Sequence, residues 1–205
     1  MPKPKRMKKF LQIGTVAFLF VFVLLPVLGH VWRKRHPVNF PSVVPANQWE
    51  FFASEQGKFR VLFPGSPQET NVIINMTATN MAVPLFYVWA DRQTEYAVNY
   101  VDYPKALNKL SPKEQFDIVQ AGVAEKIGNV VTQRNFIFEK FPARDFEFVV
   151  GGKGNASGKI RLVLVDERLY QIEVIFLAKN PHEDDFKTFF NSFSLREKII
   201  LKNIK

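Results

Sequence analysis

The sequence predicts an α+β fold, with an N-terminal transmembrane helix followed by a mostly antiparallel sheet covered by helices. Three observations lead to this prediction. An uncharged run of 23 residues, 10–32, precedes the rest of the chain. After it come short segments in which apolar and polar residues alternate between turn signals, which is typical of strands. Two further segments show helical spacing, and strands combined with two separate helices indicate an α+β fold.

The first element is the transmembrane helix at residues 10–32. As a helix, 23 residues span roughly 34 Å, enough for a hydrocarbon core of about 30 Å. We expect the large apolar and aromatic side chains of this span to contact the lipid bilayer. They include Phe10, Phe18, Phe20, Phe22, Leu25 and Trp32.

The charges that flank the span predict its orientation. Five basic residues precede it and three follow it, so residues 1–9 form a cytoplasmic tail and the rest of the chain is periplasmic or lumenal. A cleaved signal peptide is the alternative interpretation. We favour an uncleaved signal anchor, because the apolar run is long for a signal peptide and no small-residue cleavage site follows it.

A stalk, a domain and a tail follow the span. Residues 33–48 contain three prolines and no regular periodicity, which indicates a stalk. Residues 49–195 form the extracytoplasmic α+β domain, and residues 196–205 form a basic C-terminal tail.

The first half of the domain is predicted to be strands. In 58–63 the residues Phe59, Val61 and Phe63 share a face, and residues 64–67, Pro-Gly-Ser-Pro, mark a turn. In 95–102 the residues alternate in the same way. The predicted strands are 49–53, 58–63, 69–76, 83–91 and 95–102.

A helix is predicted next, because Ser111 is a candidate N-cap, Pro112 stands at the first helical position and Glu114 completes a capping box. Gly128 is placed to end the helix. One apolar face is formed by Phe116, Val119, Val123 and Ile127.

The second half returns to strands and ends in a helix. The predicted strands are 130–138, 143–150, 159–165 and 169–176, with a hairpin loop at the glycine-rich residues 151–158. The last helix begins near Pro181, with Glu183 in the capping-box position. Its core stripe consists of Phe186, Phe189, Phe190 and Phe193.

Composition and charge exclude several classes of function. The chain has no cysteine, so disulfides, cysteine-ligated metals and thiol catalysis are excluded. The net charge of +9 comes from the two ends of the chain, and residues 37–195 contain 16 basic and 18 acidic residues. A basic stripe for phosphates is therefore absent from the domain, and we expect no nucleic-acid partner.

Residues for catalysis or metal binding are scarce. His182 is the one histidine in the domain, so a histidine triad or a multi-histidine metal site is nearly excluded. The acids at 183–185 are better explained as partners of a helix N-terminus than as metal ligands. We expect no enzyme, no catalytic or metal-binding residue and no cofactor. An enzyme would need a carboxylate site, which the spacing of Asp91, Asp102, Asp145 and Asp166 in the structure tests.

One strand is aromatic on both faces, at Phe86, Tyr87 and Trp89. Packing in the core is the favoured interpretation, and contact with a partner or an apolar ligand is the alternative. The tip of the glycine-rich loop offers two more candidate partner contacts, Lys153 and Asn155.

Several phrases resemble those of a bacterial extracytoplasmic domain family of unknown function. They are Trp49 with 57–67 (GKFRVLFPGSP), 96–104 (YAVNYVDYP), 141–146 (FPARDF), 168–171 (RLYQ) and 190–195 (FNSFSL). This family is similar in layout to the PsbP/Mog1-like sandwich, so the resemblance implies an antiparallel sheet between helices. PsbP-like proteins are accessory subunits or assembly factors of photosynthetic membrane complexes, on the lumenal side. The resemblance brings no catalytic residues with it.

Together these observations predict a non-catalytic, single-pass accessory subunit. Its domain is expected to dock on a larger membrane complex, photosynthetic or electron-transfer, from the non-cytoplasmic side and to stabilise it. The expected partners are the lipid bilayer and other membrane protein subunits. The alternative is a membrane-tethered binding module for a small apolar ligand or an envelope polymer.

Overall fold

The structure is a computed structural model, and it describes residues 48–75, 80–90, 93–103, 110–150, 156–177 and 182–196. The predicted span at 10–32, the N-terminal tail, most of the stalk and the C-terminal tail beyond residue 196 lie outside these residues. Within the described part of the chain, neither helix is long and apolar enough to cross a membrane.

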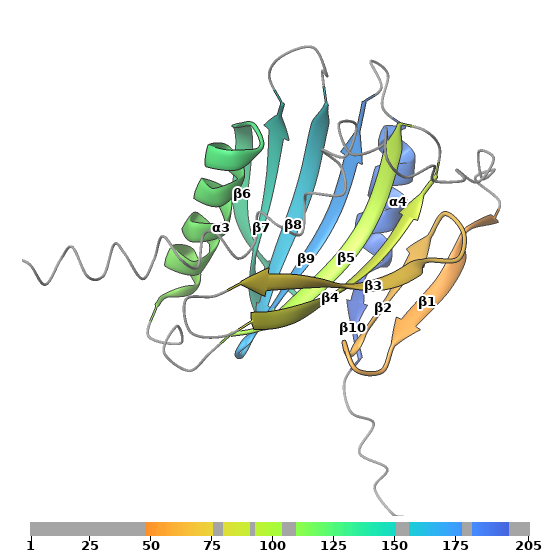
Figure 1. Ribbon diagram of the computed structural model, residues 1–205, viewed down its shortest axis with the longest axis horizontal. Coiled ribbons are helices and arrows are strands. Elements are labelled where there is room, and N and C mark those ends of the chain that lie inside the picture. Colours follow the sequence, from red (N-terminus) through yellow and green to blue (C-terminus); the bar gives the residue numbers. More distant parts are fainter. Residues whose placement is uncertain are drawn as a thin grey trace, which may run out of the picture.

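Ten strands and two helices make up the described fold (Figure 1). The strands are β1 (Glu50–Ser54), β2 (Phe59–Phe63), β3 (Gln68–Asn75), β4 (Asn80–Trp89), β5 (Thr94–Asp102), β6 (Asn129–Phe138), β7 (Phe141–Val149), β8 (Ser157–Val165), β9 (Arg168–Phe176) and β10 (Ser194–Leu195). The helices are α3 (Pro112–Lys126) and α4 (Glu183–Ser192).

The strands form two antiparallel sheets. The larger has seven strands in the order β3-β4-β5-β9-β8-β7-β6, and the smaller has three in the order β1-β2-β10. All pairs in both sheets are antiparallel. The predicted α+β class is confirmed. The sequence predicts a single sheet, however, and the separate small sheet with its C-terminal strand β10 corrects that expectation.

Helix α3 packs on one face of the large sheet, at the end formed by β6 and β7 (Figure 1). Its predicted apolar stripe is confirmed, because Phe116, Val119 and Val123 are buried in the cluster that covers this face. The sheet contributes alternate residues of β4, β5, β7, β8 and β9 to the same cluster. We call this side of the sheet the α3 face.

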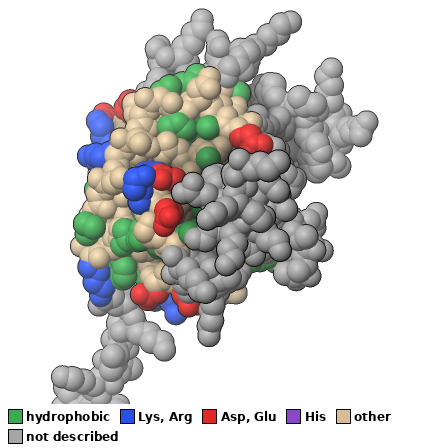
Figure 2. All heavy atoms as spheres, turned by 90° about the vertical axis from the view of Figure 1, so that its left-hand side faces the viewer, with side chains coloured by type: hydrophobic (Ala, Val, Ile, Leu, Met, Phe, Trp, Pro, Cys, Tyr) green, Lys and Arg blue, Asp and Glu red, His purple; other side chains and the backbone are tan. Residues whose placement is uncertain are grey.

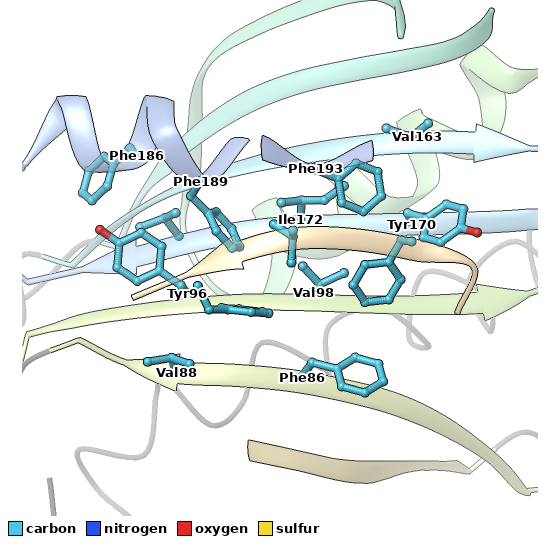
Figure 3. Close-up of a cluster of buried hydrophobic side chains, with 14 of the residues drawn as sticks. Phe86, Val88, Tyr96, Val98, Val163, Tyr170, Ile172, Phe186, Phe189 and Phe193 are labelled. Atoms are coloured by element: carbon cyan, nitrogen blue, oxygen red, sulfur yellow. The ribbon is translucent and has the colours of Figure 1, made fainter. Parts of the chain in front are cut away.

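The opposite face is covered by the small sheet and α4, and its core is strongly aromatic. Figure 3 shows Phe186 and Phe189 of α4 above Tyr96 of β5, with Tyr170 beside Phe193. The ring centres of Tyr96 and Phe189 lie 5.2 Å apart in an edge-to-face arrangement, which is favourable for aromatic pairs. The stripe predicted for the last helix is therefore confirmed as core.

The first strands and the last strand of the described fold meet in the small sheet. β10 pairs with β2, and the Leu62 N–H donates to the Ser192 hydroxyl at 2.8 Å. The Arg60 Nε donates to the Ser194 hydroxyl, also at 2.8 Å. The sequence pattern did not predict strand β10, because a strand of two residues is defined only by its pairing with β2.

The start of α3 agrees with its prediction, and its end has a different cause. Ser111 accepts from the Glu114 N–H at 3.3 Å, and the Glu114 carboxylate accepts from the Ser111 N–H at 2.8 Å, so the capping box is present. The helix ends before Gly128, as expected. A Cβ on Gly128 would lie 2.4 Å from the Val149 carbonyl oxygen, so a side chain is excluded there by the close approach of β7.

The start of α4 corrects its prediction. His182 is the N-cap and makes no side-chain cap hydrogen bond, so the capping box expected with Glu183 does not form. The Glu183 carboxylate instead pairs with the Lys159 ammonium at 3.1 Å. The acids Glu183, Asp184 and Asp185 all lie in the first turn, where they complement the helix dipole.

Two hairpin turns are tighter than the sequence predicts. β7 begins at Phe141, so the turn after β6 is the pair Glu139-Lys140, with Glu139 at φ 56°. The turn between β8 and β9 is Asp166-Glu167, with Asp166 at φ 52°. Pro142 lies within β7 and pairs only with β6, because the pairing of β7 with β8 starts at Ala143.

Candidate functional site

Polar side chains gather at the centre of the large sheet, on one face of the two buried strands β5 and β9. β5 and β9 are paired along their whole length, and eight of the nine residues in each are buried. On the α3 face these two strands carry Glu95, Asn99, Gln171 and Glu173, which we call the sheet-face polar cluster. All four are at most 3% exposed.

Asn99 and Gln171 lie directly opposite each other on β5 and β9. Both side chains are fully buried. Neither Oδ1 nor Nδ2 of Asn99 has a hydrogen-bond partner in the structure, and the same holds for Oε1 of Gln171. A buried polar atom without a partner costs about 1–3 kcal/mol, so this pair calls for an explanation beyond packing.

Glu173 is the most perturbed group of the cluster. Its Oε2 accepts a hydrogen bond from the Gln171 Nε2 at 2.8 Å. Burial raises the pKa of the Glu173 carboxyl well above its usual range, the hydrogen bond from Gln171 opposes this rise, and the charge of Glu95 adds to it. Burial disfavours the ionised form because the sheet interior solvates charge poorly, so ionisation of this carboxyl is favoured only where a positive charge lies beside it.

The register explains why the four side chains are neighbours. Glu173 lies opposite Ala97, and Glu95 lies opposite Ile175, so the two acids are diagonal neighbours on one face. Diagonal cross-strand positions are about 7–8 Å apart at Cα, within reach of long side chains. Leu85 and Leu162 flank the Asn99–Gln171 pair on β4 and β8. The cluster is thus a group of polar side chains with apolar residues on the strands to either side.

A second polar group lies at the far end of the same two strands. The guanidinium of Arg168 donates to both carboxylate oxygens of Asp102, at 2.5 and 2.7 Å, and to the Gln56 carbonyl at 2.8 Å. The hydrogen bond from Arg168 is the largest influence that lowers the Asp102 pKa. This group joins the large sheet to the β1–β2 turn, and its satisfied geometry indicates a structural role.

Arg144 is a third polar group, fully buried beneath α3. It donates to Asn135 Oδ1 at 2.7 Å, to Asp117 Oδ1 at 2.8 Å and to Gln120 Oε1 at 3.1 Å. Its guanidinium also lies 5.5 Å from the centre of the Phe116 ring. These contacts tie α3 to β6 and β7, which makes Arg144 a structural arginine.

The structure separates the predicted partner contacts. Phe86 is 3% exposed and packs in the aromatic core, so the favoured core interpretation is confirmed for it and it offers no surface to a partner. Tyr87 is half-buried and donates to the Gln68 Oε1 at 2.7 Å. Trp89 is also half-buried. Lys153 and Asn155 lie outside the described residues, as do all the predicted span residues.

Of the four carboxylates considered for an enzyme, two are held in ion pairs with arginines. Asp102 pairs with Arg168 on β9, whereas Asp145 on β7 pairs with Arg161 at 2.8 Å. Asp166 lies in the β8–β9 turn, and Asp91 is outside the described residues. In the part of the chain that the structure describes, no three or more His, Cys, Asp or Glu residues gather as a metal site.

Sequence reasoning missed the sheet-face polar cluster, although a signal exists. Asn99 alternates with apolar residues in 95–102, and Gln171 and Glu173 do so in 169–176. Polar residues at alternate positions indicate a solvated face when the strand lies on the surface. They indicate a buried polar site only when the strand is buried on both faces. Here that burial follows from the position of β5 and β9 at the centre of the sheet, which the sequence pattern does not reveal.

The two antiparallel sheets and their two helices define a PsbP-like fold. One similar solved structure is that of cyanobacterial PsbP (CyanoP) from Synechocystis, with a TM-score of 0.54 and 11% identity over 78% of this chain and 99% of CyanoP. At this identity the likeness establishes the fold alone. The predicted PsbP-like layout is thereby confirmed.

Two other solved structures are also similar. A protein of unknown function from Pseudomonas aeruginosa, a putative regulator, has a TM-score of 0.41 and 6% identity over 60% of this chain and 92% of its own. A Bacteroides thetaiotaomicron protein has a TM-score of 0.44 and 9% identity over 74% of this chain and 50% of its own. No protein-family model and no curated protein matches the chain.

Proposed function

We propose that the chain is a non-catalytic, single-pass accessory subunit of a larger membrane protein complex, photosynthetic or electron-transfer. Residues 10–32 anchor it in the bilayer as an uncleaved signal anchor. The domain at 49–195 lies on the periplasmic or lumenal side, where it docks on the complex and stabilises it. Its partners are lipid and other membrane protein subunits, and nucleic acid is not among them.

The PsbP-like fold is the observation that carries this proposal. The likeness spans nearly all of CyanoP, and the sequence resemblance implies the accessory role that PsbP-like proteins have. Fold likeness alone does not establish function. The proposal is supported by the combination of this fold with the apolar run at 10–32, which is long enough to serve as a membrane anchor.

The described surface fits a protein partner better than a phosphate backbone. Basic and acidic side chains lie interspersed on the face shown in Figure 2 and form no basic stripe. Large apolar side chains are exposed at separate places, with Phe51 on β1 76% exposed and Ile137 on β6 65% exposed. Apolar side chains of this kind supply contacts at protein interfaces.

The test is the native mass of the full-length chain after extraction from its own membrane in mild detergent, with identification of the proteins that co-migrate. We expect a defined assembly larger than a single 23.7 kDa chain. Deletion of residues 1–36 should weaken the association. A matched control replaces residues 10–32 by an unrelated transmembrane segment of equal length, and it separates simple anchoring from contact within the membrane.

Two outcomes contradict the proposal in different ways. A single chain in every mild detergent argues against an accessory subunit and favours the membrane-tethered binding module. In the second outcome, deletion of residues 1–36 dissolves the assembly, whereas Phe51→Ser and Ile137→Ser both leave it intact. This result would show that the membrane segment, and not the exposed apolar residues of the domain, makes the contact with the complex.

A further inference from the structure

The sheet-face polar cluster has a composition that packing does not explain. Four polar side chains lie together on the two central strands, and two of them, Asn99 and Gln171, are fully buried. Both amide atoms of Asn99 and the Gln171 Oε1 have no hydrogen-bond partner. Apolar residues of similar size at these positions would avoid the free-energy cost of unpaired buried groups.

The atoms that the cluster offers are mainly oxygens. Two carboxamide oxygens, Asn99 Oδ1 and Gln171 Oε1, lack a partner, and the carboxyl groups of Glu95 and Glu173 lie beside them on the same face. Carboxylates combined with carboxamide oxygens are the ligands that hard cations take. A set with two acidic groups matches the charge of a divalent ion.

Among the residues that the structure describes, no Lys or Arg forms an ion pair with Glu173. The Gln171 amide donates to its carboxyl, and the charge of Glu95 opposes its ionisation. Arg144, on the same face, binds Asp117 under α3, and Arg168 lies on the opposite face of the sheet, over the Tyr100 ring. An ionised carboxylate in a buried site requires a counter-charge, and a bound cation supplies it.

From this geometry we propose that Glu173, Gln171 and Asn99, with Glu95 beside them, form a binding site for a hard divalent cation. Calcium fits better than magnesium. The protein oxygens come from two adjacent strands and approach the ion from one side, an irregular arrangement that calcium accepts and the near-ideal octahedron of magnesium does not. This inference does not depend on the accessory role.

The experiment uses the full-length chain in mild detergent, freed of metal with EDTA, unfolded in urea and refolded with CaCl2, MgCl2 or EDTA. Refolding gives the ion access to a buried site. We expect CaCl2 at up to about 10 mM to be sufficient, since sites outside the cytosol bind calcium with dissociation constants of about 0.1–1 mM. CaCl2 should raise the thermal unfolding midpoint by about 5 °C over EDTA, and MgCl2 should raise it less.

Three variants show whether the ion binds at this cluster. Glu173→Gln removes the carboxylate but keeps a hydrogen-bonding group for Gln171, and it should abolish the shift. Asn99→Asp adds a carboxylate, so it should lower the midpoint in EDTA and give a larger rise with CaCl2 than the wild type. Glu147→Gln is the control, because Glu147 pairs with Lys159 at 2.9 Å elsewhere on the sheet, and it should keep the wild-type shift.

Equilibrium dialysis against CaCl2 provides a second measurement that does not rely on unfolding. We expect one calcium ion per chain for the wild type and for Glu147→Gln, and none for Glu173→Gln. The proposal is overturned if Glu173→Gln binds calcium as the wild type does. It is also overturned if neither the wild type nor Asn99→Asp binds or responds to the ion.

Discussion

Arg168 on β9 lies over the ring of Tyr100 on β5, with the guanidinium carbon 4.4 Å from the ring centre. The same guanidinium forms two hydrogen bonds with Asp102 and one with the Gln56 carbonyl. One side chain therefore joins the central pair of strands to the turn of the small sheet. This relationship explains how the two sheets hold a fixed relative position at this end of the fold.

Arg168→Lys should lower the free energy of unfolding by about 1 kcal/mol, because lysine loses both the paired hydrogen bonds and the stacking on the ring. Urea unfolding measures this. The matched control is Lys113→Gln, which removes a surface ion pair on α3 and should cost about 0.5 kcal/mol or less. Equal effects of the two substitutions would show that Arg168 acts as an ordinary surface charge.

Arg144 should respond differently to two substitutions. Its partners on the surface side, such as Asp117, stay hydrated when it is removed, so Arg144→Met should cost about 1–2 kcal/mol. Arg144→Lys keeps a buried charge but lacks the planar guanidinium that donates to three acceptors. It should lower the free energy of unfolding by about 3 kcal/mol. Urea unfolding of both variants checks the order, and a lysine variant more stable than the methionine variant contradicts it.

Glu173 should make stability depend on pH in a defined direction. Its folded-state pKa is raised above the usual 4.5, so the folded chain keeps a proton that the unfolded chain releases. The stabilisation is complete below about pH 4.5 and is lost as pH rises through the folded-state pKa.

Glu173→Gln should remove this pH dependence of the free energy of unfolding. The variant should therefore become more stable relative to the wild type as pH rises above about 4.5. Urea unfolding over this range, in EDTA to exclude metal, provides the test. Glu147→Gln should retain the wild-type pH profile. A wild-type profile in Glu173→Gln would assign the pH dependence to another group.

Gly128→Ala should be strongly destabilising although the residue lies just outside a helix. The new Cβ would lie 2.4 Å from the Val149 carbonyl oxygen, and a backbone atom within a paired strand moves only with its neighbours. We expect a loss of about 2–3 kcal/mol. Ala121→Ser, at an exposed position of α3, is the control, and thermal unfolding should show little change for it.

Local sequence patterns predicted the elements that depend on local chemistry. The capping box of α3 and its stripe of Phe116, Val119 and Val123 are present as expected. The aromatic stripe of α4 is also in the core. The prediction of a capping box at the start of α4 was wrong, because Glu183 pairs with Lys159 across the fold instead of capping its own helix.

The sequence by itself determined that strands, a helix, strands and a second helix follow one another, since periodicity and capping act over a few residues. Only the tertiary structure decided that β1, β2 and β10 leave the main sheet. The burial of Asn99 and Gln171 at opposite positions of β5 and β9 likewise follows only from the tertiary structure. The physical reason is that a strand's neighbours, and with them the burial of both its faces, are set by contacts between residues far apart in the chain.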